Sequence, residues 1–242
     1  IGELQYYTDA ENITTNYSYN LTGAKTQVRN PNYGSKIYHY DLAGNLIRYY
    51  APNMRRRYTQ YQYHYNRLTA VTFPSLPNNI PNPSNVSYTY GPPNSGNGAG
   101  KVIRKTYDSG YTEYQYGQLG EVTQEKTVIT GIGIPTVETT MHFDYDTFGR
   151  LYSLTYPDGE LVMYHYDDAG YLEAVRRDNG GNRGDLIRSI YYNNYGQRTQ
   201  VLLGNGLRQE YEYRPTDRAL RRNHIVAHYG DLLDLRYRYD HV

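Results

Sequence analysis

The fold of this chain is decided by one stretch of sequence, Tyr164-His165-Tyr166-Asp167-Asp168-Ala169-Gly170-Tyr171-Leu172. Residues two apart in a strand point to the same face, so Tyr164 and Tyr166 should lie side by side. Asp167 can accept hydrogen bonds from the backbone N–H groups of a turn, and Gly170 can adopt a positive φ. The stretch therefore predicts a strand, a tight turn and a second strand.

The same pattern recurs along the whole chain. It consists of an aromatic residue or Ile, any residue, Tyr, and then usually Asp, Asn or Gly, and it occurs ten times. Successive second tyrosines are 21 to 29 residues apart, which is the spacing of a repeat protein. These second tyrosines are Tyr19, Tyr40, Tyr65, Tyr90, Tyr116, Tyr145, Tyr166, Tyr192, Tyr213 and Tyr239.

The fuller copies continue with an acidic turn residue and with a Gly three residues after it. The third copy lacks this Gly, and the ninth copy has Asp217 in its place. We expect the second tyrosines to be structural repeat positions. We expect the same of the turn residues Asp41, Gly44, Gly120, Asp146, Gly149, Asp167, Gly170, Gly196 and Asp240.

A second kind of turn closes each repeat. Pro157-Asp158-Gly159, Gly204-Asn205-Gly206 and Asp108-Ser109-Gly110 are hairpin-turn signals between strand-like segments. The longer repeats should place their extra residues in hairpin tips, as in residues 178–184. The sequence therefore predicts an all-β fold in which tandem antiparallel β-hairpin repeats form a long, coiled single sheet with tyrosine ladders on one face.

The domain organisation follows from the repeats. We expect residues 1–242 to form a single array of about ten repeats, with about 20 strands. Irregular loops should lie within residues 74–100, where residues 86–90 form an intervening strand. The sequence begins at Ile1 and ends inside the tenth motif at Val242, so we expect a fragment of a longer chain.

Composition excludes several classes of function. A formal net charge of +1 gives no electrostatic reason to expect a nucleic acid or an anionic membrane as partner. The absence of Cys rules out disulfides and a thiol nucleophile. No apolar run approaches the roughly 20 residues that span a bilayer. Among the aromatic residues, 33 Tyr stand against 3 Phe and no Trp, so one amphipathic side chain supplies almost all of the rings.

Candidate catalytic residues have simpler structural explanations. His39, His64 and His165 occupy the middle of Tyr-x-Tyr motifs, on the face opposite the tyrosines, where cross-strand pairing explains them better than a metal site. Hydrolytic carboxylate pairs could be formed by Asp144, Asp146, Asp167 and Asp168, but turn capping accounts for Asp146 and Asp167. We therefore expect no enzyme activity, no metal and no cofactor.

Two segments resemble RHS/YD repeats: Tyr166-Asp167-Asp168-Ala169-Gly170-Tyr171-Leu172 and Tyr145-Asp146-Thr147-Phe148-Gly149-Arg150-Leu151-Tyr152. Such repeats occur in bacterial RHS proteins, in the B and C components of Tc toxin complexes and in teneurins. The resemblance implies a spiralling sheet that closes into a hollow cocoon, secretion to the outside of the cell, and as partners the flanking repeats of the same chain and an enclosed toxin domain or companion toxin subunit.

The resemblance therefore favours a structural shell segment of a large secreted RHS-type toxin or polymorphic effector, which helps to enclose a C-terminal cargo. The alternative is a carbohydrate- or receptor-binding adhesion module, in which exposed tyrosine rings stack on glycans. The two differ in whether the ring faces stack within the sheet or remain open.

Overall fold

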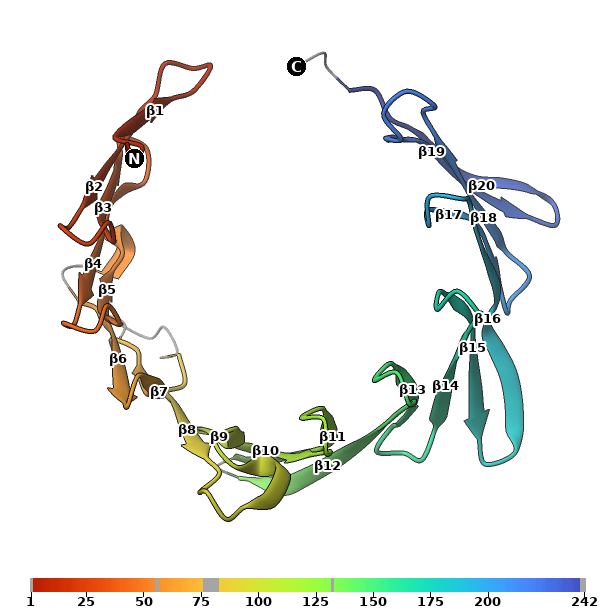
Figure 1. Ribbon diagram of the computed structural model, residues 1–242, viewed down its shortest axis with the longest axis horizontal. Helices are drawn as coiled ribbons and strands as arrows, with labels where there is room; N and C mark the ends of the chain where they lie inside the picture. The colour runs from red at the N-terminus through yellow and green to blue at the C-terminus, as the bar shows by residue number, and fades with distance from the viewer. Residues whose placement is uncertain (1, 55–56, 76–82, 132, 240–242) are drawn as a thin grey trace. The chain divides into compact units, whose positions relative to one another are not determined.

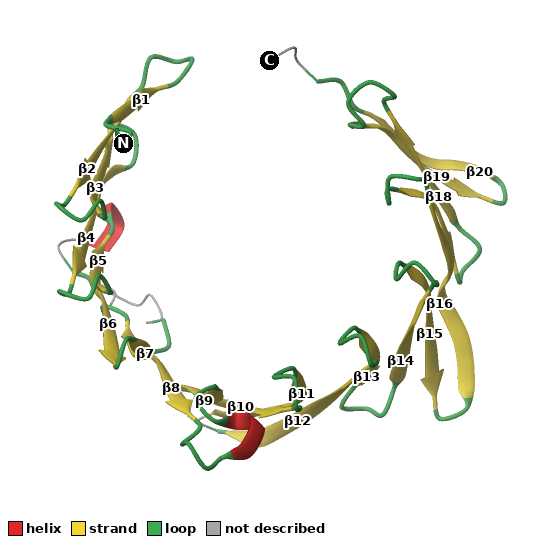
Figure 2. Ribbon diagram, in the orientation of Figure 1, coloured by secondary structure: helices red, strands yellow, loops and turns green. Residues whose placement is uncertain are grey.

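The computed structural model describes residues 2–54, 57–75, 83–131 and 133–239. These ranges contain strands and turns, with short 3-10 turns at Pro52–Met54 and Gly96–Gly98 (Figure 1, Figure 2). Twenty strands belong to one sheet. The predicted all-β fold of tandem antiparallel hairpins is therefore confirmed.

Successive strands pair antiparallel from β1 to β10 and from β12 to β20. The strands are β1 (Tyr6–Thr8), β2 (Thr14–Tyr19), β3 (Lys25–Asn30), β4 (Gly34–Tyr40), β5 (Leu46–Tyr50), β6 (Thr59–His64), β7 (Arg67–Thr72), β8 (Val86–Tyr90), β9 (Val102–Tyr107), β10 (Gly110–Tyr116), β11 (Val122–Gly131), β12 (Ile134–Tyr145), β13 (Leu151–Thr155), β14 (Leu161–Tyr166), β15 (Leu172–Asn179), β16 (Asn182–Tyr192), β17 (Arg198–Leu203), β18 (Arg208–Tyr213), β19 (Leu220–Ala227) and β20 (Gly230–Arg236).

The chain groups into two compact units. The first unit consists of residues 1–115 and 126–138, and the second of residues 116–125 and 139–242. In the first unit, the predicted turn at residues 108–110 joins β9 to β10. In the second unit, the predicted turns at residues 157–159 and 204–206 join β13 to β14 and β17 to β18. Strand β8 lies where the sequence predicts a strand between two loops. Within the predicted loop region of residues 74–100, residues 76–82 lie outside the described ranges.

The prediction that the extra residues of this repeat lie in the hairpin tip, at residues 178–184, is wrong. Asp178 pairs with Arg183, and Asn179 pairs with Asn182, so the two strands continue almost to the end of the hairpin. Gly180 and Gly181 form the turn with φ values of 59° and 96°. Two successive residues with positive φ suit a tight two-residue hairpin turn, so the extra residues of this repeat lengthen β15 and β16 instead of the tip.

A β-bulge lies beside the second tyrosine of most motifs. In one hairpin His165 pairs with Ala174, whereas Tyr166 pairs with Leu172, so Glu173 is an extra residue in β15. A bulge of this kind bends its strand and increases the local twist. The same register shift occurs at Tyr19, Tyr40, Tyr63, Tyr90, Tyr145, Tyr192 and Tyr213.

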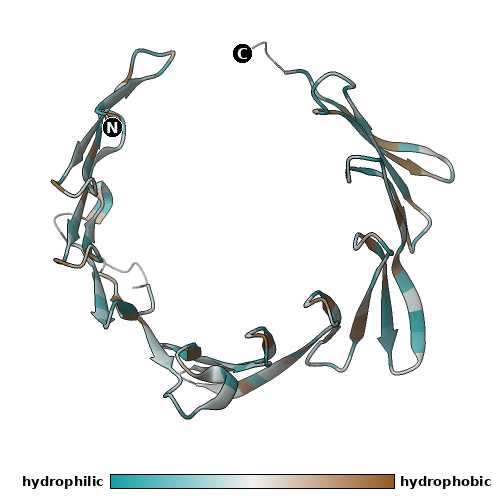
Figure 3. Cartoon of the chain, in the orientation of Figure 1, coloured by the Kyte–Doolittle hydropathy of each residue, from teal (hydrophilic) through white to brown (hydrophobic). Residues whose placement is uncertain are grey.

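A row of buried aliphatic side chains crosses the second unit. Leu154 pairs with Val162, and Ile190 pairs with Val201, and all four side chains are buried. Val162 lies on the same strand face as Tyr164, because the two are separated by two positions. Figure 3 shows hydrophobic stretches on several strands of this unit. The tyrosine face therefore also buries the aliphatic core.

Candidate functional site: the joints between repeats

The second tyrosine of a motif contacts the preceding repeat through its hydroxyl. The hydroxyl of Tyr166 donates a hydrogen bond to the backbone carbonyl oxygen of Leu151 at 2.9 Å. Leu151 is the cross-strand partner of Tyr145, the second tyrosine of the preceding motif. We call such a hydrogen bond, from the hydroxyl of a second tyrosine to a backbone carbonyl of the preceding repeat, a tyrosine bridge.

This tyrosine bridge recurs in both units. Burial raises the pKa of the hydroxyls of Tyr145, Tyr192 and Tyr213, which keeps these phenols neutral donors over a wider pH range. Burial also raises the pKa of Tyr116. The bridges, at 2.8 to 3.0 Å, join Tyr19 to Leu4, Tyr40 to Lys25, Tyr90 to Leu68, Tyr145 to Val122, Tyr166 to Leu151, Tyr192 to Leu172, Tyr213 to Arg198 and Tyr239 to Leu220.

The carbonyl of Leu151 is available because β13 and β14 pair over only part of their length. Their register joins Ser153, Leu154 and Thr155 to the first half of β14, and Leu151 lies beyond it. A buried polar group without a partner costs about 1 to 3 kcal/mol. The tyrosine bridge supplies the missing donor where neighbouring hairpins diverge.

The turn that follows Tyr145 is held by the side chain of Asp146. One carboxylate oxygen accepts hydrogen bonds from the backbone N–H groups of Phe148 and Arg150, each at 2.9 Å. Gly149 donates its N–H to the Asp146 carbonyl and has a φ of 75°. Desolvation acts to raise the pKa of Asp146, but hydrogen bonds from Arg150 and Phe148 outweigh it and lower that pKa. The carboxylate is therefore occupied in closing the turn.

The other predicted turn residues occupy equivalent places. Asp41 accepts from the backbone N–H groups of Ala43 and Asn45, and Asp167 accepts from that of Tyr171. Hydrogen bonds from Asn45 lower the pKa of Asp41. Four further predicted glycines have positive φ values at the matching turn position: Gly44 at 85°, Gly120 at 93°, Gly170 at 88° and Gly196 at 72°.

The third copy is shifted by two residues relative to the sequence motif. Tyr65 lies in the turn between β6 and β7, with a φ of 49° and a side chain that is 88% exposed. The bulge lies instead at Tyr63, which pairs with Leu68, and the carbonyl of Leu68 accepts the bridge from Tyr90. Tyr63 therefore takes the place that the sequence motif assigns to Tyr65, because a two-residue turn at Tyr65 and Asn66 replaces the longer capped turn.

The ninth copy closes its turn with a different residue. Arg218 has a φ of 61°, so it adopts the left-handed conformation that Gly adopts elsewhere. Asp217 accepts a hydrogen bond from the backbone N–H of Ala219 and pairs with Arg214. The turn is one residue longer than the turns that follow Tyr145 and Tyr166, since Tyr213 pairs with Leu220. Asp240 of the tenth copy lies outside the described residues.

Arg150 connects a turn to the next tyrosine, a contact that the motif does not reveal. Its guanidinium lies 4.2 Å from the ring centroid of Tyr166 and forms an ion pair with Asp146 at 2.7 Å. A cation over an aromatic ring is worth about 0.5 to 1 kcal/mol at exposed sites. A similar contact places Arg214 4.7 Å from the centroid of Tyr239. Arg150 ends one turn and Arg214 begins another. In both cases the guanidinium lies over the ring of the second tyrosine of the next motif.

Two of the three predicted histidine positions lie near aromatic rings. The ring of His39 lies 5.5 Å from that of Tyr50, and the ring of His64 lies 4.4 Å from that of Tyr65. His165 pairs with Ala174 on β15. Within residues 2–54, 57–75, 83–131 and 133–239, no group of three or more His, Cys, Asp or Glu could hold a metal ion. No helix in the same ranges is long and apolar enough to cross a membrane.

The hairpins, bulges and tyrosine bridges define a β-hairpin repeat protein. Solved structures with the same fold include the crystal structure of TcdB2-TccC3-Cdc42, with a TM-score of 0.73, 18% identity and 97% of this chain covered. The Photorhabdus luminescens Tc holotoxin pore with the mutation TccC3-D651A has a TM-score of 0.72, 19% identity and the same coverage. A third structure, TcdB2-TccC3-TEV, has a TM-score of 0.72, 21% identity and 93% coverage.

These matches confirm, at the level of the fold, the predicted resemblance to the B and C components of Tc toxins. This chain spans only 12 to 14% of the length of the matching chains. No known protein-family profile matches the sequence. A search of curated proteins also finds no match.

Proposed function

We propose that this chain is a structural segment of the shell of a large secreted toxin of the RHS or Tc type, and that it helps to enclose a C-terminal cargo without catalysing a reaction. In this proposal, the hairpins of residues 1–242 form one continuous array, and flanking repeats of a longer chain extend it. The similarity of 97% of the chain to part of TcdB2-TccC3 supports this role.

The single observation that carries the proposal is the tyrosine bridge. A shell has to remain closed between hairpins, and each bridge joins neighbouring hairpins at the place where their strands diverge. The hydroxyls of the bridging tyrosines are used in these hydrogen bonds. Their protons are therefore not available for donation to a sugar, whereas the glycan-binding alternative depends on open ring faces.

Protease protection tests the proposal in the full-length polypeptide that contains this segment. We expect the C-terminal domain of that polypeptide to resist digestion. Replacing Tyr145, Tyr166 and Tyr192 together by Phe should speed its digestion, because three bridges in the second unit are lost. Tyr229→Phe is the matched control, since Tyr229 is 97% exposed. Equal digestion of the C-terminal domain, whether or not this segment is present, would contradict the proposal.

A further inference from the structure

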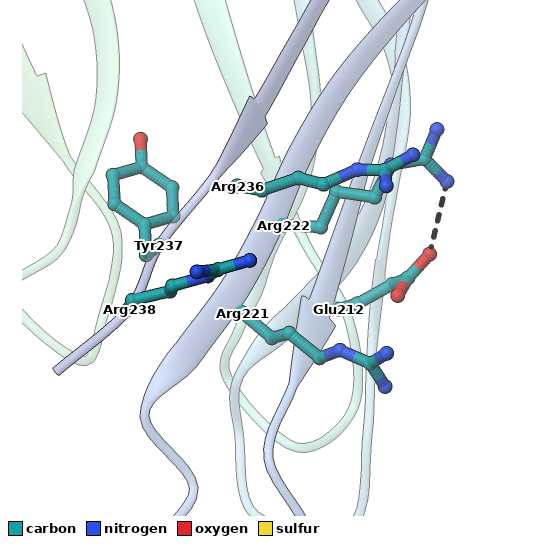
Figure 4. Close-up of a pocket in the computed structure, with 6 residues that line it drawn as sticks. All are labelled: Glu212, Arg221, Arg222, Arg236, Tyr237 and Arg238. Carbon is teal, nitrogen blue, oxygen red and sulfur yellow. Dashed lines mark hydrogen bonds and ion pairs between the residues drawn. The ribbon is translucent and has the colours of Figure 1, made fainter.

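We propose that a pocket in the second unit binds a compact oxyanion, the phosphate or sulfate group of an ester. The pocket has a volume of about 400 Å³. It is lined by Glu212, Arg221, Arg222, Arg236, Tyr237 and Arg238 (Figure 4). The inference concerns this pocket alone and does not depend on the shell proposal.

The β-bulge of the ninth copy brings two arginines to this pocket. Arg222 pairs with Glu212, whereas Tyr213 pairs with Leu220, so Arg221 is the extra residue of β19. Adjacent residues of a regular strand point to opposite faces, but a bulge interrupts the alternation and redirects a side chain. Arg221 and Arg222 consequently line the same pocket.

The end of β20 adds the other two arginines. Arg236 and Arg238 are two positions apart, so an extended chain directs them to one side. The backbone N–H of Tyr237 donates to the carbonyl of Arg221 at 2.9 Å, and the Tyr239 hydroxyl donates to Leu220 at 2.8 Å. These two bonds hold the segment that carries Arg236 and Arg238 against the bulge.

The pocket carries uncompensated positive charge. Arg222 pairs with Glu212 at 3.2 Å and with Asp234 at 2.6 Å, and Arg236 pairs with Asp234 at 3.0 Å. Four arginines against these two carboxylates leave an excess of two positive charges. Within the described residues, no ion pair is formed by Arg221 or Arg238. In Figure 4 their side chains extend toward the side on which Glu212 lies.

This arrangement suits a phosphate or sulfate group in the sign of its charge and in geometry. A guanidinium offers planar paired donors that suit phosphate and sulfate oxygens, and Arg222 is already fixed by its two carboxylate partners. The net charge of the whole chain is only +1, so the positive charge is local to this pocket. The pocket volume and the charge excess of two therefore favour one compact group over a long polyanion.

Titration calorimetry of the 242-residue chain with inorganic phosphate and with sulfate tests the inference. We expect one ion to bind per chain, and replacing Arg221 and Arg238 together by Gln should weaken binding by about tenfold or more, as lost charge-assisted hydrogen bonds predict. Tighter binding of phosphate would identify a phosphate ester as the ligand class, and tighter binding of sulfate would identify a sulfate ester.

Two variants serve as controls. Arg183→Gln removes one positive charge from an 80% exposed side chain outside the pocket and should leave the affinity unchanged. Glu212→Gln removes a competing carboxylate and should strengthen anion binding. The inference is wrong if neither anion binds, if the double variant binds as well as the original chain, or if Arg183→Gln weakens binding equally.

Discussion

The hydroxyl of a bridging tyrosine supplies what a phenylalanine ring cannot, a hydrogen-bond donor for a carbonyl beyond the paired part of a strand. Tyr166 also receives the guanidinium of Arg150 on its ring. The ring and the hydroxyl therefore have separate roles, and a substitution that removes only the hydroxyl can distinguish them.

Tyr166→Phe should lower the free energy of unfolding by about 1 kcal/mol, because the Leu151 carbonyl loses its donor while the ring remains. Urea unfolding followed by circular dichroism measures this change. Tyr229→Phe, at a side chain that is 97% exposed, should unfold as the original chain does. An unchanged unfolding midpoint for Tyr166→Phe would show that the bridge contributes no stability.

Asp234 should titrate far below an ordinary aspartate. Hydrogen bonds from Arg222 and Arg236 outweigh desolvation and lower the pKa of its carboxyl to about 2. A carboxyl with a depressed folded pKa stabilises the protein fully above its unfolded pKa of about 3.9, and loses that contribution as the pH falls through about 2. Carboxyl NMR titration measures the midpoint. Arg222→Gln should raise it toward the ordinary value, and the explanation fails if that variant leaves it unchanged.

At the scale of the element, the hairpin is defined by its capped turn and by the bulge beside it. The carboxylate of Asp146 and the conformation of Gly149 act within a few residues, so they operate in any hairpin with this sequence. The bulge changes which residues face each other. It moves Arg221 to the face of Arg222 and thereby creates the arginine pocket.

Gly149→Ala should destabilise the chain by about 1 to 2 kcal/mol, the cost of a left-handed conformation for a residue with a Cβ. A Cβ at this position would meet no atom within 4 Å, so the cost comes from the backbone at its φ of 75° and not from a clash. Thermal unfolding measures the loss. Gly149→Asn should lose less, because Asn tolerates this conformation. Gly2→Ala should be neutral, and a Gly149→Ala variant as stable as the original would refute the argument.

At the scale of the whole molecule, the sheet is built by adding hairpins, so its stability depends on what each outermost strand contacts. Among the described strands, β20 pairs with β19 alone, and all seven residues of β20 are exposed. An edge strand with free backbone groups pairs readily with another chain. The isolated chain should therefore associate through this strand.

Leu232→Lys should reduce that association, because a charge on an edge strand opposes pairing between chains. Leu232 lies on β20 and is 62% exposed. Sedimentation velocity over a range of concentrations measures the effect. Leu42→Lys provides the matched control at a fully exposed turn residue outside the strands. Equal association of the Leu232 variant and the original chain would exclude β20 as the contact.

The sequence by itself determined the class of fold, an all-β sheet of antiparallel hairpins. Alternating tyrosines specify a strand face, and an Asp or Asn followed by a Gly specifies a turn, because both signals act over a few residues. The same locality explains why Asp41, Asp146 and Asp167 could be assigned to turns before their contacts were known.

Only the tertiary structure decided which residues meet across strands. It placed Tyr63 instead of Tyr65 at the bulge, gave each bridging hydroxyl its carbonyl, and gathered four arginines from β19 and the end of β20. The bridges depend on contacts between residues 15 or more positions apart. The bulges depend on the register between the two strands of a hairpin. A local motif contains no information about that pairing, because a shift of one residue moves every side chain to the other face.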